Sequence, residues 1–312
     1  MQLPWMGRLD KMRSMNTRQK TEREPCSGNV CGTRSTGGPG KTPTRVLQPA
    51  PTIRLRPEQA EALPRNRQVQ PAETVAHFGT SDTGLVRDHN EDAFFFSSLG
   101  TTSLYAVADG MGGHDAGEVA SRIAMDTVCG VIREECSAEA DLLNLVERAV
   151  QQANRAVQQE ALMKGSDMGT TISVALVSDH TAYVANVGDS RVYWIENGFI
   201  NQITTDHSLV AKLAAAGKLT KEEARTHPKA NLLYRTIGSA GRVPVDTFRV
   251  PLAKGGTLLL CTDGLWGEVT DSDIHRICVS EKDARAAGIK LTRMANENGG
   301  KDNITVVIAK IV

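Results

Sequence analysis

Four aspartates stand where apolar runs of the sequence begin or end, and three of them have a glycine as direct neighbour. A strand end is a rigid platform, and a neighbouring glycine lets an ion or a phosphate approach the main chain. Hard cations such as Mg²⁺ and Mn²⁺ prefer carboxylate, carbonyl and water oxygens. A single Asp-Gly pair is usually a turn, and four independent turns are the alternative interpretation. The joint pattern indicates a divalent-metal site with the candidate carboxylates Asp109, Asp189, Asp263 and Asp302.

The chain shows no zinc-type ligand set beside these acids. Zinc sites combine Cys and His at short spacings, whereas the six cysteines here are scattered and no histidine cluster accompanies the aspartates. We therefore expect reduced thiols, as in proteins of reducing compartments. The cysteines are Cys26, Cys31, Cys129, Cys136, Cys261 and Cys278.

A charged segment, RDHNED at residues 87–92, precedes an apolar run. The planar fork of an arginine holds two phosphate oxygens, so Arg87 suits the anchoring of a phosphorylated substrate. Glu91 and Asp92 add two carboxylates to the candidate set. A solvated charged turn is the alternative for this segment taken alone.

Strands must position these residues, and hydrophobic periodicity predicts them from about residue 74 onward. Strand runs separated by helical runs predict an α+β layered domain rather than a doubly wound parallel one. The expected strands are 75–80, 93–97, 104–108, 170–177, 182–186, 192–195, 199–203, 257–261 and 304–311. The expected helices are 118–133, 138–163, 271–279 and 281–296, with a mixed region at 208–241.

Residues 1–73 differ in composition from the rest of the chain. Nine of the twelve prolines lie there, and sustained hydrophobic periodicity is lacking. Such a segment cannot bury enough apolar surface to offset chain entropy, so we expect a disordered, basic, Pro/Gly-rich extension before one domain at 74–312. Residues 1–72 carry 13 Lys and Arg against 5 Asp and Glu, and the remainder carries 23 against 31. This acidic body does not fit a dedicated nucleic-acid binder.

The composition also bears on location. Hydrophobic residues make up 40% and charged residues 23%, as in soluble globular proteins. No apolar run approaches the ~20 residues that cross a bilayer, and the first twenty residues lack the apolar region of a signal peptide. We therefore expect a cytoplasmic protein with no membrane partner.

The chemistry-bearing segments resemble, in order along the chain, the motifs of the metal-dependent Ser/Thr protein phosphatases (the PPM, or type 2C-like, family), in its bacterial branch. Each motif alone is weak, and six in order are specific. The resemblance covers about residues 74–312 and leaves 1–73 without a counterpart. The matching pieces are Arg87 with Asn90, Glu91 and Asp92, then VADGMGG at 107–113, GTT at 169–171, VGDSR at 187–191, CTDG at 261–264 and DNIT at 302–305.

The resemblance implies a four-layer α/β/β/α sandwich, in which helices flank two antiparallel sheets and the site lies between the sheets. It implies two Mn²⁺ or Mg²⁺ ions, and a third, weaker one as in bacterial members. By resemblance, Asp109 bridges the first two ions. The carboxylate of Glu91 and the carbonyl of Gly110 help to hold one of them, and Asp263 and Asp302 hold the other.

Further roles follow from the same resemblance. Asp189, with Asp263, matches the third metal position. Asp92 is expected to support metal-bound water, and Arg87 is expected to bind the substrate phosphate. Thr170 is expected only to support the site.

The implied reaction is hydrolysis of phosphoserine and phosphothreonine on proteins. A hydroxide that bridges two ions about 3.5–4 Å apart attacks phosphorus in line, and no phosphoenzyme forms. The expected partners are phosphorylated proteins and an opposing bacterial Ser/Thr kinase, and we expect a monomer. Two alternatives stay open: a catalytically inactive phosphoprotein-binding module, against which the complete set of carboxylates argues, and a phosphatase of a transcription or secretion switch. Mn²⁺ is favoured over Mg²⁺ by the resemblance alone.

One departure from the family pattern concerns the general acid. Many eukaryotic members have a histidine where this chain has Met111, which cannot donate a proton. Metal-bound water, His114 or His207 are the alternatives, although a structural or solvent-facing role is favoured for each histidine. Residues 206–241 match the region called the flap in bacterial members, for which we expect a mobile surface element that influences substrate choice.

Overall fold

The computed structural model describes residues 76–113, 116–137, 140–225 and 227–312. The expected extension at residues 1–73 and the candidate acid His114 therefore lie outside the described residues. The four cysteines within the described ranges are free. No helix in these ranges is long and apolar enough to span a membrane.

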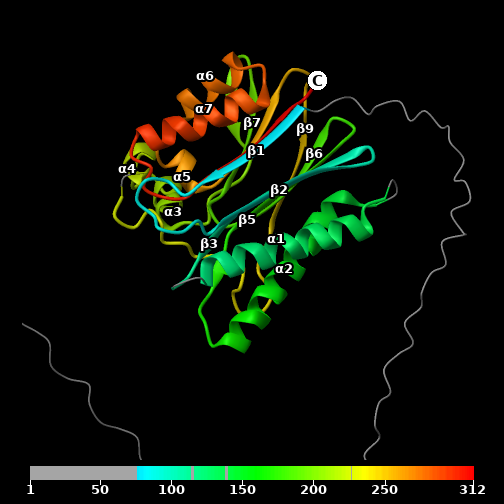
Figure 1. The fold of residues 1–312 in the computed structure, drawn as a ribbon, viewed down its shortest axis with the longest axis vertical. Coiled ribbons are helices and arrows are strands. Elements are labelled where there is room, and N and C mark those ends of the chain that lie inside the picture. Colours follow the sequence, from blue (N-terminus) through cyan, green and yellow to red (C-terminus); the bar gives the residue numbers. More distant parts are fainter. Residues whose placement is uncertain (1–75, 114–115, 138–139, 226) are drawn as a thin grey trace, which may run out of the picture. The chain divides into compact units, whose positions relative to one another are not determined.

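Two antiparallel sheets form the centre of the described domain (Figure 1). The first sheet has the strand order β1-β11-β10-β7-β8, and the second has the order β2-β3-β5-β6-β9, with the short β4 paired to β3. The strands are β1 Ala76–Asp82, β2 Asp92–Leu99, β3 Thr102–Met111, β4 Gly169–Thr170, β5 Ile172–Ser178, β6 Thr181–Val187, β7 Arg191–Glu196, β8 Phe199–Gln202, β9 Asp246–Pro251, β10 Thr257–Cys261 and β11 Ile304–Lys310.

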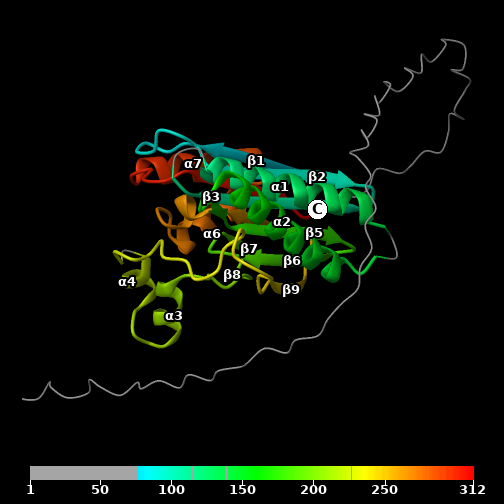
Figure 2. The ribbon, with the colours of Figure 1, turned by 90° about the horizontal axis from the view of Figure 1, so that it is seen from below.

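Helices cover the outer faces of the sheets, with α1 and α2 on the second sheet and α6 and α7 on the first (Figure 1). A third apolar cluster fills the space between the sheets. This arrangement confirms the predicted four-layer α+β sandwich. Figure 2 shows that α3 and α4 stand out from the layers. The helices are α1 Ala116–Glu135, α2 Leu142–Lys164, α3 Leu209–Ala215, α4 Lys221–Arg225, α5 Asp263–Trp266, α6 Asp271–Ser280 and α7 Ala284–Glu297.

Helix α2 shows how the local sequence sets an element. Its apolar residues Leu145, Val146, Ala149, Ala153 and Val157 are buried in the core. The side chain of Asp141 accepts a hydrogen bond from the Asn144 N–H, so it caps the helix. Gly165 ends it with a φ of 61°, a conformation that glycine adopts without strain. The predicted start at residue 138 was wrong, because the helix begins only after its N-cap Asp141.

Three local predictions differ from the structure. Strand β9 was not predicted, because its sequence lacks an apolar run and it lies half-exposed at a sheet edge. Asp109 does not end its strand, since β3 continues to Met111 where it pairs with β4. The short helix α5, of which Asp263 is the first residue, was not predicted either.

Candidate active site

Strands β2 and β3 bring the first acidic residues together. In their antiparallel register Asp92 lies directly opposite Asp109, and the Cβ atoms of such pairs are about 4.5–5.5 Å apart. Glu91 immediately precedes β2, and its carbonyl oxygen accepts a hydrogen bond of 3.1 Å from the Gly110 N–H. The register therefore gathers four of the predicted site residues at one end of the second sheet.

Gly110 occupies a place that only glycine fits. A Cβ added there would lie 2.1 Å from the carbonyl oxygen of Gly117 and 2.6 Å from that of Glu91. This close approach brings the first turn of α1 against β3. From the same helix, Ser121 Oγ donates to the Glu91 carbonyl at 2.6 Å. These contacts hold the backbone of Gly110, whose carbonyl oxygen is a predicted metal ligand.

The first sheet supplies the other two main carboxylates. Asp263 follows β10 by two residues, and Asp302 precedes β11 by two residues. These two strands are hydrogen-bonded neighbours. A Cβ added at Gly264 would lie 2.1 Å from the carbonyl oxygen of Asn303. This glycine therefore lets the two segments that carry the carboxylates approach each other closely.

Two polar side chains join the sheets beside the acids. Thr262 Oγ1 donates to Oδ2 of Asp92 at 2.8 Å. Asn303 Oδ1 accepts from the Glu91 N–H at 2.8 Å, and its Nδ2 donates to two carbonyls of the loop before β2. The bonds from Thr262 to Asp92 and from the Glu91 N–H to Asn303 join segments of the first sheet to segments of the second. They set the separation between the two groups of carboxylates.

Burial and mutual repulsion raise the pKa values of Asp92, Asp109, Asp189 and Asp263. Burial raises the pKa of Asp109 well above its ordinary value, and the charges of Asp263, Asp92, Asp189 and Asp302 raise it further. Burial and the charge of Asp302 raise the pKa of Asp263 to about 6, against the opposing effects of a hydrogen bond with Asp109 and nearby positive charge. Like charges act strongly only at short range. The structure therefore brings all five aspartates into one electrostatic cluster.

Arg87 reaches this cluster from the loop between β1 and β2. Its Nη2 donates to Oδ2 of Asp302 at 2.7 Å, and its side chain is 47% exposed. Burial lowers the pKa of Arg87, but Asp302, Asp109 and Asp263 outweigh that effect and raise it. For the carboxyl group of Glu91, burial has the opposite effect and raises the pKa. A partly exposed cation beside an acidic cluster is suited to receive an anion from solvent.

The donor set fits a hard divalent cation. Asp92 Oδ1 and Asp263 Oδ1 are buried and have no hydrogen-bond partner among the described residues. Within the same ranges, no three Asp, Glu, His or Cys side chains form a ready-made cage for an ion. Mg²⁺ usually keeps several waters and binds through one or two carboxylates rather than an all-protein cage. Unpaired carboxylate oxygens in an open arrangement therefore suit Mg²⁺ or Mn²⁺.

Comparison with known proteins decides the family. Residues 86–306 match the family profile described as Protein phosphatase 2C. The chain belongs to the protein phosphatase 2C family. It is 38% identical over 241 residues to the serine/threonine phosphatase stp of Listeria monocytogenes, covering 75% of this chain and 95% of that protein. It is therefore a protein serine/threonine phosphatase.

Solved structures of bacterial relatives support the same assignment for this phosphatase. Serine/threonine phosphatase Stp1 from Staphylococcus aureus superposes with a TM-score of 0.73 at 36% identity, covering 79% of this chain and 99% of that one. The catalytic domain of the phosphatase PstP, solved with 2 manganese ions, gives a TM-score of 0.68 at 33% identity, covering 76% and 98%.

The predicted third metal position of the phosphatase is connected to the main cluster. Asp189 follows β6 and is 3% exposed. Trp266 Nε1 donates to the Asp189 carbonyl oxygen at 3.1 Å. Trp266 ends α5, the helix that Asp263 begins. One hydrogen bond therefore ties together the backbone segments of two predicted ligands.

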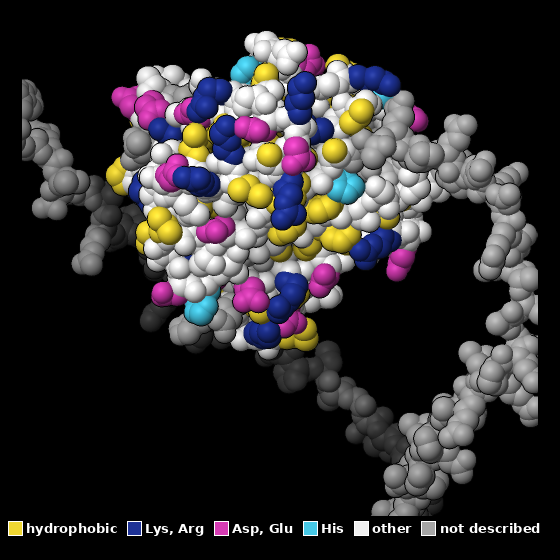
Figure 3. All heavy atoms as spheres, turned by 45° about the horizontal axis from the view of Figure 1, so that its top comes forward, with side chains coloured by type: hydrophobic (Ala, Val, Ile, Leu, Met, Phe, Trp, Pro, Cys, Tyr) yellow, Lys and Arg dark blue, Asp and Glu magenta, His cyan; other side chains and the backbone are white. Residues whose placement is uncertain are grey.

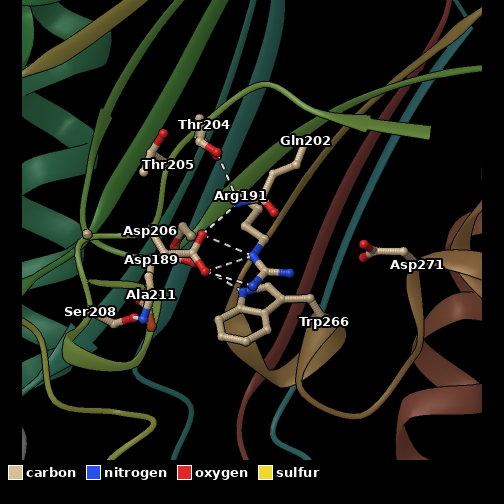
Figure 4. Close-up of polar contacts among 12 residues, drawn as sticks. Asp189, Arg191, Gln202, Thr204, Thr205, Asp206, Ser208, Ala211, Trp266 and Asp271 are labelled. Atoms are coloured by element: carbon tan, nitrogen blue, oxygen red, sulfur yellow. Dashed lines mark hydrogen bonds and ion pairs between the residues drawn. The ribbon is translucent and has the colours of Figure 1, made fainter. Parts of the chain in front are cut away.

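Figure 4 shows the side chains that hold this connection in place. The guanidinium of Arg191 lies over the Trp266 indole, 3.7 Å from the ring centroid. Arg191 also donates to both carboxylate oxygens of Asp206 over 2.7–3.2 Å. Gln202 Nε2 donates to Asp206 Oδ1 at 2.7 Å. The stacked and bidentate Arg191 therefore links the backbone segments of the two predicted ligands to Asp206, the first residue of the flap, and lysine offers neither contact.

His207 has a structural role in the phosphatase. Its side chain is 1% exposed. Its Nδ1 accepts from the Gly188 N–H at 3.0 Å, and its Nε2 lies 3.1 Å from Asp246 Oδ2. Burial lowers its pKa despite the contact with Asp246. Both ring nitrogens are engaged, which supports the structural role that the sequence favoured over that of a general acid.

A cavity of about 790 Å³ lies between the flap and the body of the phosphatase. Helices α3 and α4 form one wall, and strands β7 and β8 with Trp266 form the other. Asp109 and Asp263 do not line it. This cavity therefore adjoins the Arg191–Trp266 stack rather than the carboxylate cluster.

Sequence reasoning found the acids of the phosphatase but missed most of the polar residues that hold them. Thr171 Oγ1 accepts from the Asp109 N–H at 2.9 Å and lies 2.7 Å from Ser190 Oγ. Thr170 Oγ1 donates to the Asp109 carbonyl at 2.8 Å, in line with its predicted supporting role. Ser190, Thr262 and Asn303 each lie directly beside a motif aspartate, which was the available signal, whereas Thr171 has no such neighbour. The missed residues are Thr171, Ser190, Thr262 and Asn303.

Proposed function

We propose that this phosphatase hydrolyses phosphoserine and phosphothreonine in other proteins, with two Mn²⁺ or Mg²⁺ ions held by the carboxylate cluster. The observation that carries the proposal is the convergence of Asp92, Asp109, Asp263 and Asp302 with Arg87 at one end of the sandwich. When bound, the two ions activate water for in-line attack on phosphorus and offset charge on the phosphoryl oxygens. The relative solved with 2 manganese ions supports this number.

Asp109 is the proposed shared ligand of the two ions. Burial raises its pKa and the charges of four other aspartates raise it further, which supports a position close to all of them. Glu91 and the carbonyl oxygen of Gly110 are the further ligands of one ion. Asp263 and Asp302 are the further ligands of the other. Asp109 is thus the one carboxylate whose loss disturbs both positions.

Asp92 is proposed to orient the attacking water. Thr262 fixes its Oδ2, while its Oδ1 has no partner among the described residues. A carboxylate held by one oxygen presents the other in a defined direction. Asp92 Oδ1 is therefore placed to accept a hydrogen bond from the water and to take up its proton.

Arg87 is proposed to bind the phosphoryl group. Only Nη2 is engaged among the contacts of the described residues, and it bonds to Asp302. Nη2 keeps a second N–H, which together with the N–H of Nε or of Nη1 forms the planar fork that binds two phosphoryl oxygens. The exposed position of the side chain allows a protein-bound phosphate to reach it.

The leaving oxygen is proposed to take its proton from water at the site. Met111 has no proton to donate, and both nitrogens of His207 are engaged elsewhere.

A third, weaker ion is proposed at Asp189 and Asp263, whose backbones are tied through Trp266.

Several parts of the proposal rest on resemblance and composition alone. They are an opposing bacterial Ser/Thr kinase in a signalling pathway, a monomeric state, a cytoplasmic location, and a phosphatase domain at 74–312. A phosphatase of a transcription or secretion switch would share the same site, so only its substrate would distinguish it.

The test is phosphate release from a phosphothreonine peptide by the purified chain. We expect release with Mn²⁺, none in EDTA, and a rate at least about 10²-fold lower for Asp263→Asn, as for other losses of transition-state charge stabilisation. Peptide binding without release in Mn²⁺ would contradict the proposal and favour a phosphoprotein-binding module.

A further inference from the structure

A groove beside Arg87 has no role in the chemistry above. It encloses about 470 Å³ between the loop after β1 and helix α7. Its lining includes Leu85 and Ile289, which are 69% and 49% exposed. Consecutive Cα atoms are 3.8 Å apart, so Leu85 lies within about 8 Å of the Arg87 backbone. The groove therefore begins next to the proposed phosphate anchor.

The loop that carries Leu85 is held in place. The Leu85 N–H donates to the Gly300 carbonyl at 2.7 Å, and a Cβ added at Gly300 would lie 3.0 Å from Leu85 Cγ. Gly300 precedes Asp302 by two residues, and Asp302 pairs with Arg87. The same two loops thus form the groove entrance and the Arg87–Asp302 pair. Their relative position is set by the fold rather than by the ligand.

The charged groups that line the groove are already paired. Asp82 Oδ1 accepts from the Gly84 N–H at 2.9 Å and from Asn296 Nδ2 at 3.1 Å. Arg293 Nε donates to Glu297 Oε1 at 2.7 Å. On the face that Figure 3 shows, apolar side chains likewise lie between basic and acidic ones. The groove therefore offers exposed apolar side chains to an occupant, and the charged groups named here are already hydrogen-bonded within its wall.

Two polar atoms in the groove wall lack a hydrogen-bond partner within the described part of the chain, Asn296 Oδ1 and Thr292 Oγ1. Thr292 is 8% exposed and lines the groove, and its Oγ1 has no hydrogen-bond partner within the described part of the chain. Buried hydroxyl groups are normally paired. A peptide backbone lying in the groove offers both donors and acceptors, so it can supply the missing partner.

We propose that this groove binds the substrate segment beside the phosphorylated residue and selects an apolar side chain two to four positions away. The inference rests on the proposed function, because Arg87 has to hold the phosphoryl group. An extended peptide rises about 3.3 Å per residue, so two to four residues span about 7–13 Å. That distance takes the chain from the anchor past Leu85 and into the groove. The occupant is thus an extended phosphopeptide with a leucine-like residue near its phosphoserine or phosphothreonine.

The test compares phosphothreonine peptides with an alanine background. Each carries one Leu or one Ser at a position two, three or four residues from the phosphothreonine, on either side. At one or more positions we expect kcat/KM to be about 10-fold higher for the Leu peptide, mainly through KM, as for other apolar pockets. The double variant Leu85→Gln/Ile289→Gln should bring that ratio close to one. The variant should hydrolyse p-nitrophenyl phosphate, which has no flanking residues, at the wild-type rate.

Two controls separate the groove from the fold and from the chemistry. Leu162→Gln changes a leucine at the end of α2 that is 77% exposed, and it should keep the wild-type ratio. Ile289 lies on α7, away from the active-site loop. The single variant Ile289→Gln should reduce the ratio of kcat/KM between the Leu and Ser peptides only partly. A wild-type ratio near one at every position, or a ratio unchanged in both groove variants, would overturn the groove while p-nitrophenyl phosphate is still hydrolysed. Failure of the wild type on every substrate in Mn²⁺ would overturn the proposed function itself.

Discussion

The Nη2 atom of Arg87 lies 2.7 Å from Oδ2 of Asp302, so the proposed phosphate anchor and a proposed metal ligand form an ion pair. Each residue has a different partner in the proposed reaction, the phosphoryl group for Arg87 and a cation for Asp302. The side chains are 47% and 24% exposed, and exposed ion pairs contribute only ~0–1 kcal/mol. Exchange of partners therefore costs little, while the pair keeps Arg87 directed at the carboxylate cluster.

Replacing Arg87 tests the anchor. We predict that Arg87→Lys lowers kcat/KM for a phosphopeptide by about 10- to 100-fold, because lysine lacks the planar fork that binds two phosphoryl oxygens. Steady-state kinetics at saturating Mn²⁺ measure this. The control is Arg122→Lys, an exposed arginine that pairs with Glu118 on α1. An Arg87→Lys enzyme with wild-type kcat/KM would contradict the assignment.

The stability of the metal-free chain should depend on the ionisation of Asp263. Its pKa in the folded chain is about 6, against about 3.9 for an ordinary aspartate in an unfolded chain. The folded state holds this proton more tightly, so its stabilising effect is complete below about pH 4 and is lost as the pH rises through about 6. The loss is about 1.4 kcal/mol per unit of pKa difference.

Asp263→Asn removes that ionisation. In EDTA at pH 7 we predict a melting temperature several degrees above that of the wild type, and a difference that disappears near pH 4. Differential scanning calorimetry across this pH range measures both values. Asp179→Asn, at an exposed turn, is the control. A metal-free Asp263→Asn chain that melts below the wild type at pH 7 would refute the repulsion within the cluster.

Trp266 should act on metal affinity through the Asp189 backbone. Trp266→Phe keeps an aromatic ring beside Arg191 but removes the Nε1–H that bonds to the Asp189 carbonyl. We predict that half-maximal activation needs about 10-fold more Mn²⁺, as for other residues that orient ligands, with kcat nearly unchanged at saturation. Trp194→Phe is the matched control, since its Nε1 bonds instead to Glu196. Equal Mn²⁺ requirements in the two variants would show that Trp266 only packs.

Gly110 should tolerate no side chain. Gly110→Ala places a methyl group against two carbonyl oxygens, so we predict a loss of about 1–3 kcal/mol in the free energy of unfolding, as for other overpacked sites. Urea denaturation measures it. Gly198→Ala adds a methyl group where no atom lies within 4 Å, and it should change this free energy little. Equal effects of the two substitutions would contradict the close approach at Gly110.

The layered fold and the acids of the site were predictable because both leave local signals. Apolar periodicity marks strands and helices, and the acids lie next to recognisable strand ends and glycines. Strand β9 left no such signal because it is a half-exposed edge strand. The bond from Trp266 to Asp189 and the pair of Arg87 with Asp302 join residues 77 and 215 positions apart. Tertiary packing alone brings such partners together, so spacing within a motif does not predict them.

The most direct test of two-ion catalysis counts Mn²⁺ bound per chain by equilibrium dialysis and measures phosphate release in the same samples. The two-ion mechanism predicts that release rises only as the second ion binds. It also predicts that Asp109→Asn, which removes the proposed shared ligand, loses both the second ion and the activity. Full activity with one ion or none bound per chain would contradict the mechanism.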